Sequence, residues 1–187
     1  FRMAERRIVE MNPSGQGVIS FISNYSWLDG LSFTGMREKY LEVFDRIEID
    51  CLNGDKYKTG KLTPDGEPDP SAFSTEYNRE GIQVGTAIAT LVKVDAASRR
   101  VSHGGEDAAA TSAIERGGGA ASTSERGGDA ASTIRFRHFW GRTKREDLLA
   151  GKGEYQILSP VAELGFPFIP GHVATGYVGW PALPDLL

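Results

Sequence analysis

The chain of 187 residues is 40% hydrophobic and carries a formal net charge of -4. Its length suits one domain of modest core, or one incomplete domain with appendages. The negative charge excludes a uniformly basic surface for nucleic acid but allows a local basic patch. The single cysteine, Cys51, excludes an internal disulfide and a cysteine-rich zinc site. We interpret Cys51 as a small buried apolar residue.

No apolar run approaches the ~20 residues that a membrane-spanning helix needs, and no signal peptide is apparent. We therefore expect a cytoplasmic protein without a membrane partner. The chain begins at Phe1 rather than at a methionine and stops shortly after a proline-rich stretch. We interpret it as a piece of a longer protein, or as the short product of a damaged reading frame.

Helix-like and strand-like patterns alternate in the first part of the chain. Residues 2–11 place apolar side chains on one stripe, which predicts an amphipathic helix ended by the turn residues 12–15. Residues 18–22 form a nearly continuous apolar run, which is typical of a strand buried on both faces. A second helix is predicted over residues 32–44, with Ser32 as its N-cap.

The next segments predict the rest of a sheet. Residues 46–52 alternate between apolar and charged side chains, which predicts a strand with one wet face near a sheet edge. Residues 53–85 have no period and several turn-forming residues, and a loop of this length is often functional. Residues 86–94 are strand-like again. This order of elements predicts one end of an α/β layered sheet.

The middle of the chain differs in kind. Residues 95–133 are built from Ala, Gly, Ser, Thr and a few charges, and the ten residues 115–124 are nearly repeated by 125–134. The segment has almost no large apolar side chain to bury, so it is predicted to be a disordered linker. A solenoid is the alternative, but it would need more repeats and a buried apolar position in each.

The last part, residues 134–187, is predicted to be a small mixed α/β extension. Residues 134–140 look like a strand, and residues 143–146 form a capping-box pattern that opens a short helix through Ala150. Residues 155–158 are a further strand candidate, and the remainder is rich in proline and aromatic residues.

Several segments together resemble one family of DNA methyltransferases. Residues 15–37 (GQGVISFISNYSWLDGLSFTGMR) resemble the segment after the catalytic motif in large adenine-specific (N6) DNA methyltransferases. These belong to fused single-chain restriction-modification enzymes of the type ISP kind and to related phage-defence methylases. Residues 45–54 (DRIEIDCLNG) are similar to the next strand of these enzymes, and residues 81–88 (GIQVGTAI) to their following motif. Residues 136–148 and 180–185 look like the stretch beyond the methylase core.

This resemblance implies the C-terminal end of a doubly wound, Rossmann-like methyltransferase sheet, whose last two strands form an antiparallel hairpin at one edge. Residues 18–22 would be the buried fifth strand, residues 46–52 the edge strand, and residues 86–94 the strand between them. The implied domains are the C-terminal part of a methyltransferase domain (1–94), a disordered linker (95–133) and the start of a target-recognition-like region (134–187).

The resemblance also implies a chemistry whose main motif is missing from this sequence. Methylation of adenine N6 needs S-adenosylmethionine at the carboxyl ends of the first strands and a target base flipped out of the duplex. The family holds that base with an Asn/Asp-Pro-Pro-aromatic tetrapeptide and binds the donor largely with upstream residues; neither set is present here. Residues 12–15 (NPSG) lack the second proline and the aromatic residue, so we interpret them as a helix-ending turn. No catalytic residue is assigned.

The candidates for a target-base or DNA cleft are Asn24, Tyr25, Asp29 and Gln83. Asn24 and Tyr25 follow the carboxyl end of a predicted strand, where α/β sheets place ligands, and Gln83 precedes the strand at the family's base-pocket motif. In the alternative interpretation, Asn24 and Asp29 satisfy backbone groups in turns, and Gln83 is a solvated loop residue.

A cluster of basic and aromatic residues suits contact with DNA phosphates. Its candidates are Arg137, Arg142, Lys144 and Arg145, and the alternative is a strand with a solvated face. Arg37 could reach a phosphate, but we interpret it as an exposed helix residue without a specific role. The histidines are scattered, so no metal site is predicted.

We therefore predict a fragment of an S-adenosylmethionine-dependent DNA adenine-N6 methyltransferase in restriction-modification or phage defence, inactive alone. Its expected partner is duplex DNA, bound through the full-length protein, and its expected cofactor is S-adenosylmethionine. The alternatives are a DNA-binding module and a non-functional remnant. No pattern in the sequence predicts an oligomeric state.

Overall fold

A computed structural model describes residues 2–12, 14–94 and 132–171 of the chain. Most of the predicted linker and the motif at residues 180–185 lie outside these described residues. The helical elements are α1 (Arg2–Glu5), η1 (Arg6–Glu10), η2 (Tyr25–Leu28), η3 (Leu31–Phe33), α2 (Thr34–Val43), α4 (Lys144–Leu149) and η5 (Ala162–Leu164). The strands are β1 (Gly17–Asn24), β2 (Arg46–Asn53), β3 (Thr86–Lys93), β4 (Thr133–His138) and β5 (Gln156–Leu158).

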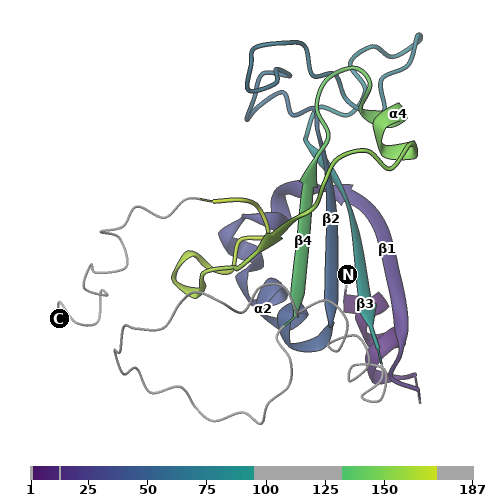
Figure 1. Cartoon of the computed structure of the whole chain (residues 1–187), viewed down its shortest axis with the longest axis vertical. Coiled ribbons are helices and arrows are strands. Elements are labelled where there is room, and N and C mark those ends of the chain that lie inside the picture. Colours follow the sequence, from purple (N-terminus) through teal and green to yellow (C-terminus); the bar gives the residue numbers. More distant parts are fainter. Residues whose placement is uncertain (1, 13, 95–131, 172–187) are drawn as a thin grey trace, which may run out of the picture.

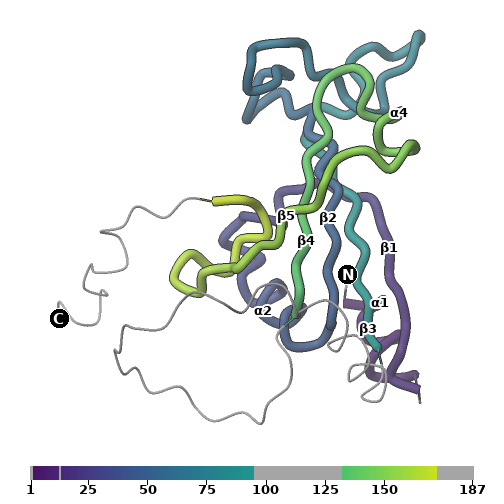
Figure 2. Tube along the Cα trace, in the orientation of Figure 1, coloured from purple at the N-terminus to yellow at the C-terminus, as the bar shows by residue number. Residues whose placement is uncertain are grey.

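The strands form one five-stranded mixed sheet in the order β1-β3-β2-β4-β5 (Figures 1 and 2). β3 is antiparallel to both β1 and β2, so the predicted place of residues 86–94 between the two other strands is confirmed. β4 is parallel to β2, and β5 is antiparallel to β4. Together with helices on one side of the sheet, this arrangement gives an α/β fold.

The predicted edge position of residues 46–52 is wrong. β2 pairs with β3 on one side and with β4 on the other, so it is an internal strand. The alternating pattern reports that one face of a strand is wetter than the other, and it says nothing about lateral neighbours. The neighbour that makes β2 internal comes from beyond the predicted linker, and it joins residues 133–138 to the same sheet as the first half of the chain.

The predicted burial of residues 18–22 on both faces is also wrong. β1 is the outermost described strand on its side, with only β3 as a partner. Ile19 is buried, whereas Val18 and Ile22 are 59% and 54% exposed on the opposite face. An apolar run is compatible with two covered faces but does not supply the second layer, and no described helix covers the face that carries Val18 and Ile22.

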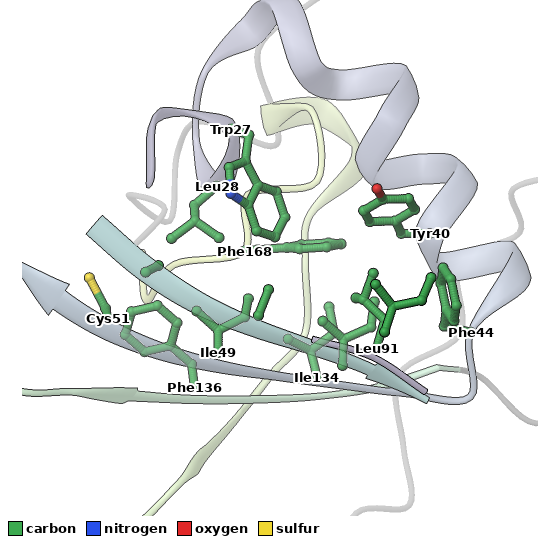
Figure 3. Packing of buried hydrophobic residues seen from close by; sticks show 14 of the residues in the cluster. Trp27, Leu28, Tyr40, Phe44, Ile49, Cys51, Leu91, Ile134, Phe136 and Phe168 are labelled. Carbon is green, nitrogen blue, oxygen red and sulfur yellow. The ribbon is translucent and has the colours of Figure 1, made fainter. Parts of the chain in front are cut away.

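The core lies on the other face of the sheet, beneath α2, η2 and the segment around Phe168 (Figure 3). Ring contacts join these elements: Trp27 lies edge-on to Phe168 at 6.0 Å and to Tyr40 at 6.4 Å between ring centroids. The sheet contributes inward side chains from its three central strands, such as Ile49 and Phe136. Cys51 belongs to this core, as predicted, and burial raises the pKa of its thiol to about 11.

Arg37 is a structural residue, and its interpretation as an exposed helix residue is wrong. It is fully buried and donates to three main-chain carbonyls: Trp27 O at 2.7 Å, Gly30 O at 2.8 Å and Gly165 O at 2.6 Å. The planar guanidinium suits such divergent acceptors. It therefore ties α2 to the turns around η2 and η5.

Two predicted helix caps are absent although both helices form. α2 begins at Thr34 after a short 3-10 turn, so Ser32 is not its N-cap. Thr143 directly precedes α4, but its hydroxyl donates to Asp147 at 2.7 Å instead of capping the backbone. No helix within the described ranges is long and apolar enough to cross a membrane.

Candidate functional site

The carboxyl ends of β1, β2 and β4 lie at the same end of the sheet, because these three strands run in the same direction. The long loop of residues 54–85 and α4 cover this end, at the top of Figure 1. Ligands of α/β sheets bind beyond the carboxyl ends of strands. The candidate site is therefore built here, from the residues that fix the loop and α4 to the strands.

Tyr25 joins the end of β1 to the end of the loop. Its backbone N–H donates to Gly85 O at 3.0 Å, and a Cβ on Gly85 would overlap the Tyr25 ring, so glycine permits this close approach. The Nζ of Lys58 lies 4.8 Å from the ring centroid. Burial, followed by the nearby Asp55 carboxylate, raises the pKa of Tyr25, so its hydroxyl stays protonated and hydrogen-bonds to Asp55.

Asp55 closes the base of the loop. One carboxylate oxygen accepts the backbone N–H of Tyr57 at 2.7 Å and of Lys58 at 2.6 Å, while the other accepts that of Gly85 at 2.8 Å. Burial acts to raise the pKa of Asp55, but these hydrogen bonds outweigh it and the net pKa is lowered. The entry and exit of the loop are thus held together by one ionised side chain.

The four cleft candidates lie around this base. The Asn24 side chain accepts the N–H of Ser26 at 2.8 Å, which is the turn role. The Asp29 carboxylate pairs with Lys58 Nζ at 2.8 Å. The backbone O of Gln83 accepts from Lys56 at 2.8 Å, and its side chain accepts the Tyr57 hydroxyl at 3.3 Å. The loop segment 56–58 therefore connects Tyr25, Asp29 and Gln83.

A buried ion pair lies between the loop and α4. Lys144 Nζ is 2.5 Å from Asp69 Oδ1 and donates to Leu52 O at 2.7 Å, and both charged side chains are almost fully buried. Asp69 also accepts the backbone N–H of Gly54 and of Gly141, each at 2.7 Å. Burial lowers the pKa of Lys144, and the Asp69 carboxylate opposes that shift.

The phosphate candidates divide into two internal and two exposed residues. Lys144 is only 1% exposed, and the side chain of Arg137 is 12% exposed, with its Nε 2.5 Å from Asp50 and its guanidinium over the Tyr155 ring. In this conformation neither presents its charge to an outside phosphate, because both charges are neutralised internally. Arg142 and Arg145 are exposed on α4 and the turn before it.

Sequence reasoning missed the residues that hold this site together, namely Asp55, Lys58 and Asp69. They lie in a stretch with no hydrophobic period, and Asp69 stands between two prolines in what looks like an ordinary turn. The available signal is the Asn53-Gly54-Asp55 run at the end of a predicted strand. Asn53 and Gly54 both have positive φ, at 50° and 73°, so the chain turns sharply there.

Neither of two cavities formed by the described residues lies at this end of the sheet. One, of about 540 Å³, is lined by α1 and α2, and the other, of about 330 Å³, lies beside β5. Within the described ranges no group of three acidic, histidine or cysteine side chains could hold a metal ion.

No protein-family model matches the chain, and no curated protein matches it. Its fold is similar to a nuclease-deletion mutant of the Type ISP restriction-modification enzyme LlaGI in complex with a DNA substrate mimic. That likeness has a TM-score of 0.56 at 17% identity and covers 97% of this chain and 14% of the other. At this identity the likeness establishes a shared fold.

Two further solved structures are similar over most of the chain. The DrdV–DNA complex has a TM-score of 0.48 at 19% identity, covering 81% of this chain and 11% of the other. The ATP-dependent Type ISP restriction-modification enzyme LlaBIII bound to DNA has a TM-score of 0.46 at 22% identity, covering 80% and 8%. The chain thus spans between 8% and 14% of the length of the three chains it resembles.

Proposed function

We propose that the chain is a DNA-contacting region of an S-adenosylmethionine-dependent DNA adenine-N6 methyltransferase in a restriction-modification system. The observation that carries the proposal is the fold likeness over 97% of the chain to LlaGI, a restriction-modification enzyme whose structure contains a DNA substrate mimic. The motif resemblance of residues 15–37 supports the same assignment independently of the fold.

The strand order supports the assignment to a methyltransferase. A β3 strand that is antiparallel to both β1 and β2 is what the Rossmann-like methyltransferase sheet requires of its last hairpin. S-adenosylmethionine would then be bound by other parts of the full-length enzyme, since the family that residues 15–37 resemble binds the donor largely with residues upstream of this segment. When bound, it would supply the methyl group for the adenine amino nitrogen.

The DNA contact is proposed for the end of the sheet that carries α4. Arg142 and Arg145 are exposed there, on the same end as Tyr25, Asp29 and Gln83. Exposed arginines bind phosphate oxygens and displace condensed counterions from DNA, so the affinity falls as salt rises. A local contact of this kind is compatible with the net charge of -4.

Fluorescence anisotropy of a labelled duplex, titrated with the purified chain at low salt and then at rising salt, tests this proposal. We expect measurable binding at low salt that weakens steadily as salt increases. Absence of binding at low salt, or binding that does not respond to salt, would contradict a phosphate-contacting role.

We also propose that the chain alone transfers no methyl group, because its sequence has no Asn/Asp-Pro-Pro-aromatic tetrapeptide. The partial match to that tetrapeptide begins at Asn12. The Asn12 side chain accepts the N–H of Ser14 at 3.1 Å and donates to Gln16 O at 2.7 Å. These are turn contacts at the amino end of β1, away from the proposed DNA face. Incorporation of labelled methyl from S-adenosylmethionine into DNA by the purified chain would disprove this part of the proposal.

A further inference from the structure

Lys144 lies between two exposed arginines in the sequence but is itself buried. Arg142 and Arg145 are exposed, whereas the Lys144 side chain is 1% exposed and its partner Asp69 is fully buried. Residues of the same charge in one short stretch therefore have different surroundings. Two can reach a phosphate, and the third is neutralised inside the protein.

The contacts of Lys144 and Asp69 converge on three separate segments. Lys144 Nζ donates to Leu52 O at the end of β2, and Asp69 accepts the N–H of Gly54 just beyond that strand. Asp69 also accepts the N–H of Gly141, in the turn before α4. One buried ion pair thus joins the end of β2, the middle of the loop 54–85 and the start of α4.

The Lys144–Asp69 ion pair and its hydrogen bonds fix the backbone that carries Arg142 and Arg145. Gly141 is held directly before Arg142, and Lys144 is held directly before Arg145. The preceding residues continue the attachment, since Phe139 N–H donates to Cys51 O at 2.8 Å and Asn53 Nδ2 donates to Phe139 O at 2.9 Å. The segment from residue 139 to residue 145 is anchored on its inner side and exposed on its outer side.

We infer that Lys144 is a positioning residue for DNA binding: its ion pair with Asp69 holds Arg142 and Arg145 in the arrangement that contacts DNA phosphates. This inference rests on the proposed function. It replaces the predicted role of Lys144 as a phosphate contact in its own right. A preorganised pair of arginines binds more tightly than a mobile pair, because less side-chain and backbone freedom is lost on binding.

A double-mutant cycle tests the inference on the full chain. The variants are Lys144→Met, the pair Arg142→Ala/Arg145→Ala, and all three together, each measured for duplex affinity over a range of salt. The slope of log affinity against log salt is negative, and each phosphate contact adds about 0.9 to its steepness, so loss of both arginines should reduce the steepness by about 1.8. Lys144→Met should weaken binding and reduce the steepness of its salt dependence when the arginines are present. It should change neither quantity when the arginines are absent.

The outcomes separate the inference from the proposed function. If loss of both arginines changes nothing, the proposed DNA face is wrong. If that loss weakens binding but Lys144→Met does not, the inference is wrong. If Lys144→Met reduces the steepness of the salt dependence by a further ~0.9 in the arginine-free background, Lys144 contacts phosphate itself and the inference is again overturned.

A readout without DNA distinguishes positioning from general folding. Amide hydrogen exchange in Lys144→Met should quicken at Gly141, whose N–H donates to Asp69, and at Asp147, whose N–H donates to Thr143 O, while the central strand amides of Ile47 and Ile49 keep their protection. Unchanged exchange at Gly141 and Asp147 would overturn the inference. If Lys144→Met does not fold, Lys144→Arg keeps the charge, alters the buried donor geometry and is judged by the same two criteria.

Discussion

At the scale of single residues, the site depends on close approaches that leave no room for substitution. Gly85 lies against the Tyr25 ring, and its N–H donates to Asp55 while its carbonyl accepts from Tyr25. Tyr25, Asp55 and Gly85 therefore form one contact that fixes the exit of the loop to the end of β1. A single extra methyl group at Gly85 should therefore weaken the contacts between Tyr25, Asp55 and Gly85.

Gly85→Ala should destabilise the protein by about 1–3 kcal/mol, because its Cβ must displace the Tyr25 ring from a packed position. The matched control is Gly35→Ala in α2, where a Cβ meets no atom within 4 Å and should stabilise the helix by about 0.5–1 kcal/mol. Thermal or denaturant unfolding measures both changes. Equal stability of the Gly85→Ala variant and the parent chain would contradict the close packing described here.

The same scale shows what the sequence could not predict. A lysine and two arginines within four positions look alike, and nothing nearby in the chain reveals that Asp69 neutralises only Lys144. The sequence likewise predicts an exposed Arg37, because the Gly165 carbonyl that accepts from its guanidinium is distant along the chain. Exposure of a charged side chain is decided by such long-range partners.

At the scale of elements, the loop 54–85 is structured because Asp55 accepts three backbone N–H groups and Asp69 accepts two. A long loop without helices or strands would otherwise lose much conformational entropy on ordering. The two carboxylates offset part of that cost with charge-assisted hydrogen bonds, which are stronger than neutral ones. The loop should therefore depend on the ionisation of these side chains.

The lowered pKa of Asp55 predicts acid sensitivity of the loop. The folded carboxylate holds a proton less tightly than the unfolded one, whose pKa is near 3.8, so its contribution is complete above that value. The contribution should be lost as the pH falls from about 3.8 towards the lower folded pKa. Amide hydrogen exchange at Tyr57, Lys58 and Gly85 measures this loss directly.

Asp55→Asn should remove that pH dependence and cost about 1–3 kcal/mol, since an amide cannot accept at both ends. Asp65→Asn is the matched control: it lies exposed in the same loop and should leave stability unchanged. Exchange rates at the loop base that respond to pH equally in the parent and in Asp55→Asn would show that another group is responsible.

Local pattern predicted most elements but not their neighbours. The predicted strands at 46–52 and 86–94 correspond to β2 (Arg46–Asn53) and β3 (Thr86–Lys93), and the predicted helix at 32–44 to α2 (Thr34–Val43). These signals are local side-chain periods, which propagate directly into secondary structure. Lateral order and face coverage depend on segments far apart in sequence, so the edge and burial predictions for β2 and β1 failed.

At the scale of the whole molecule, the chain is asymmetric along its strands. The carboxyl ends of β1, β2 and β4 carry an ordered lobe of loop and α4, with the exposed Arg142 and Arg145 (Figure 1). The amino end of β1 carries η1, where Ile8 packs against Gly17 and Arg6 and Arg7 are exposed. One pair of exposed arginines thus lies at the carboxyl end of β1 and the other pair at its amino end.

This asymmetry allows a comparison at constant net charge. Arg142→Ala/Arg145→Ala and Arg6→Ala/Arg7→Ala each remove two positive charges, so they change long-range attraction to DNA equally. They differ only in which end of the sheet loses its arginines. Any difference between the two variants therefore reports the position of the DNA contact.

The measurement that decides the proposed role is the salt dependence of duplex binding for these two variants beside the parent chain. We predict that Arg142→Ala/Arg145→Ala weakens binding and makes the fall of log affinity with log salt less steep by about 1.8, while Arg6→Ala/Arg7→Ala leaves the steepness unchanged. Equal losses in both variants, or a loss confined to Arg6→Ala/Arg7→Ala, would contradict a DNA contact at the α4 end of the sheet.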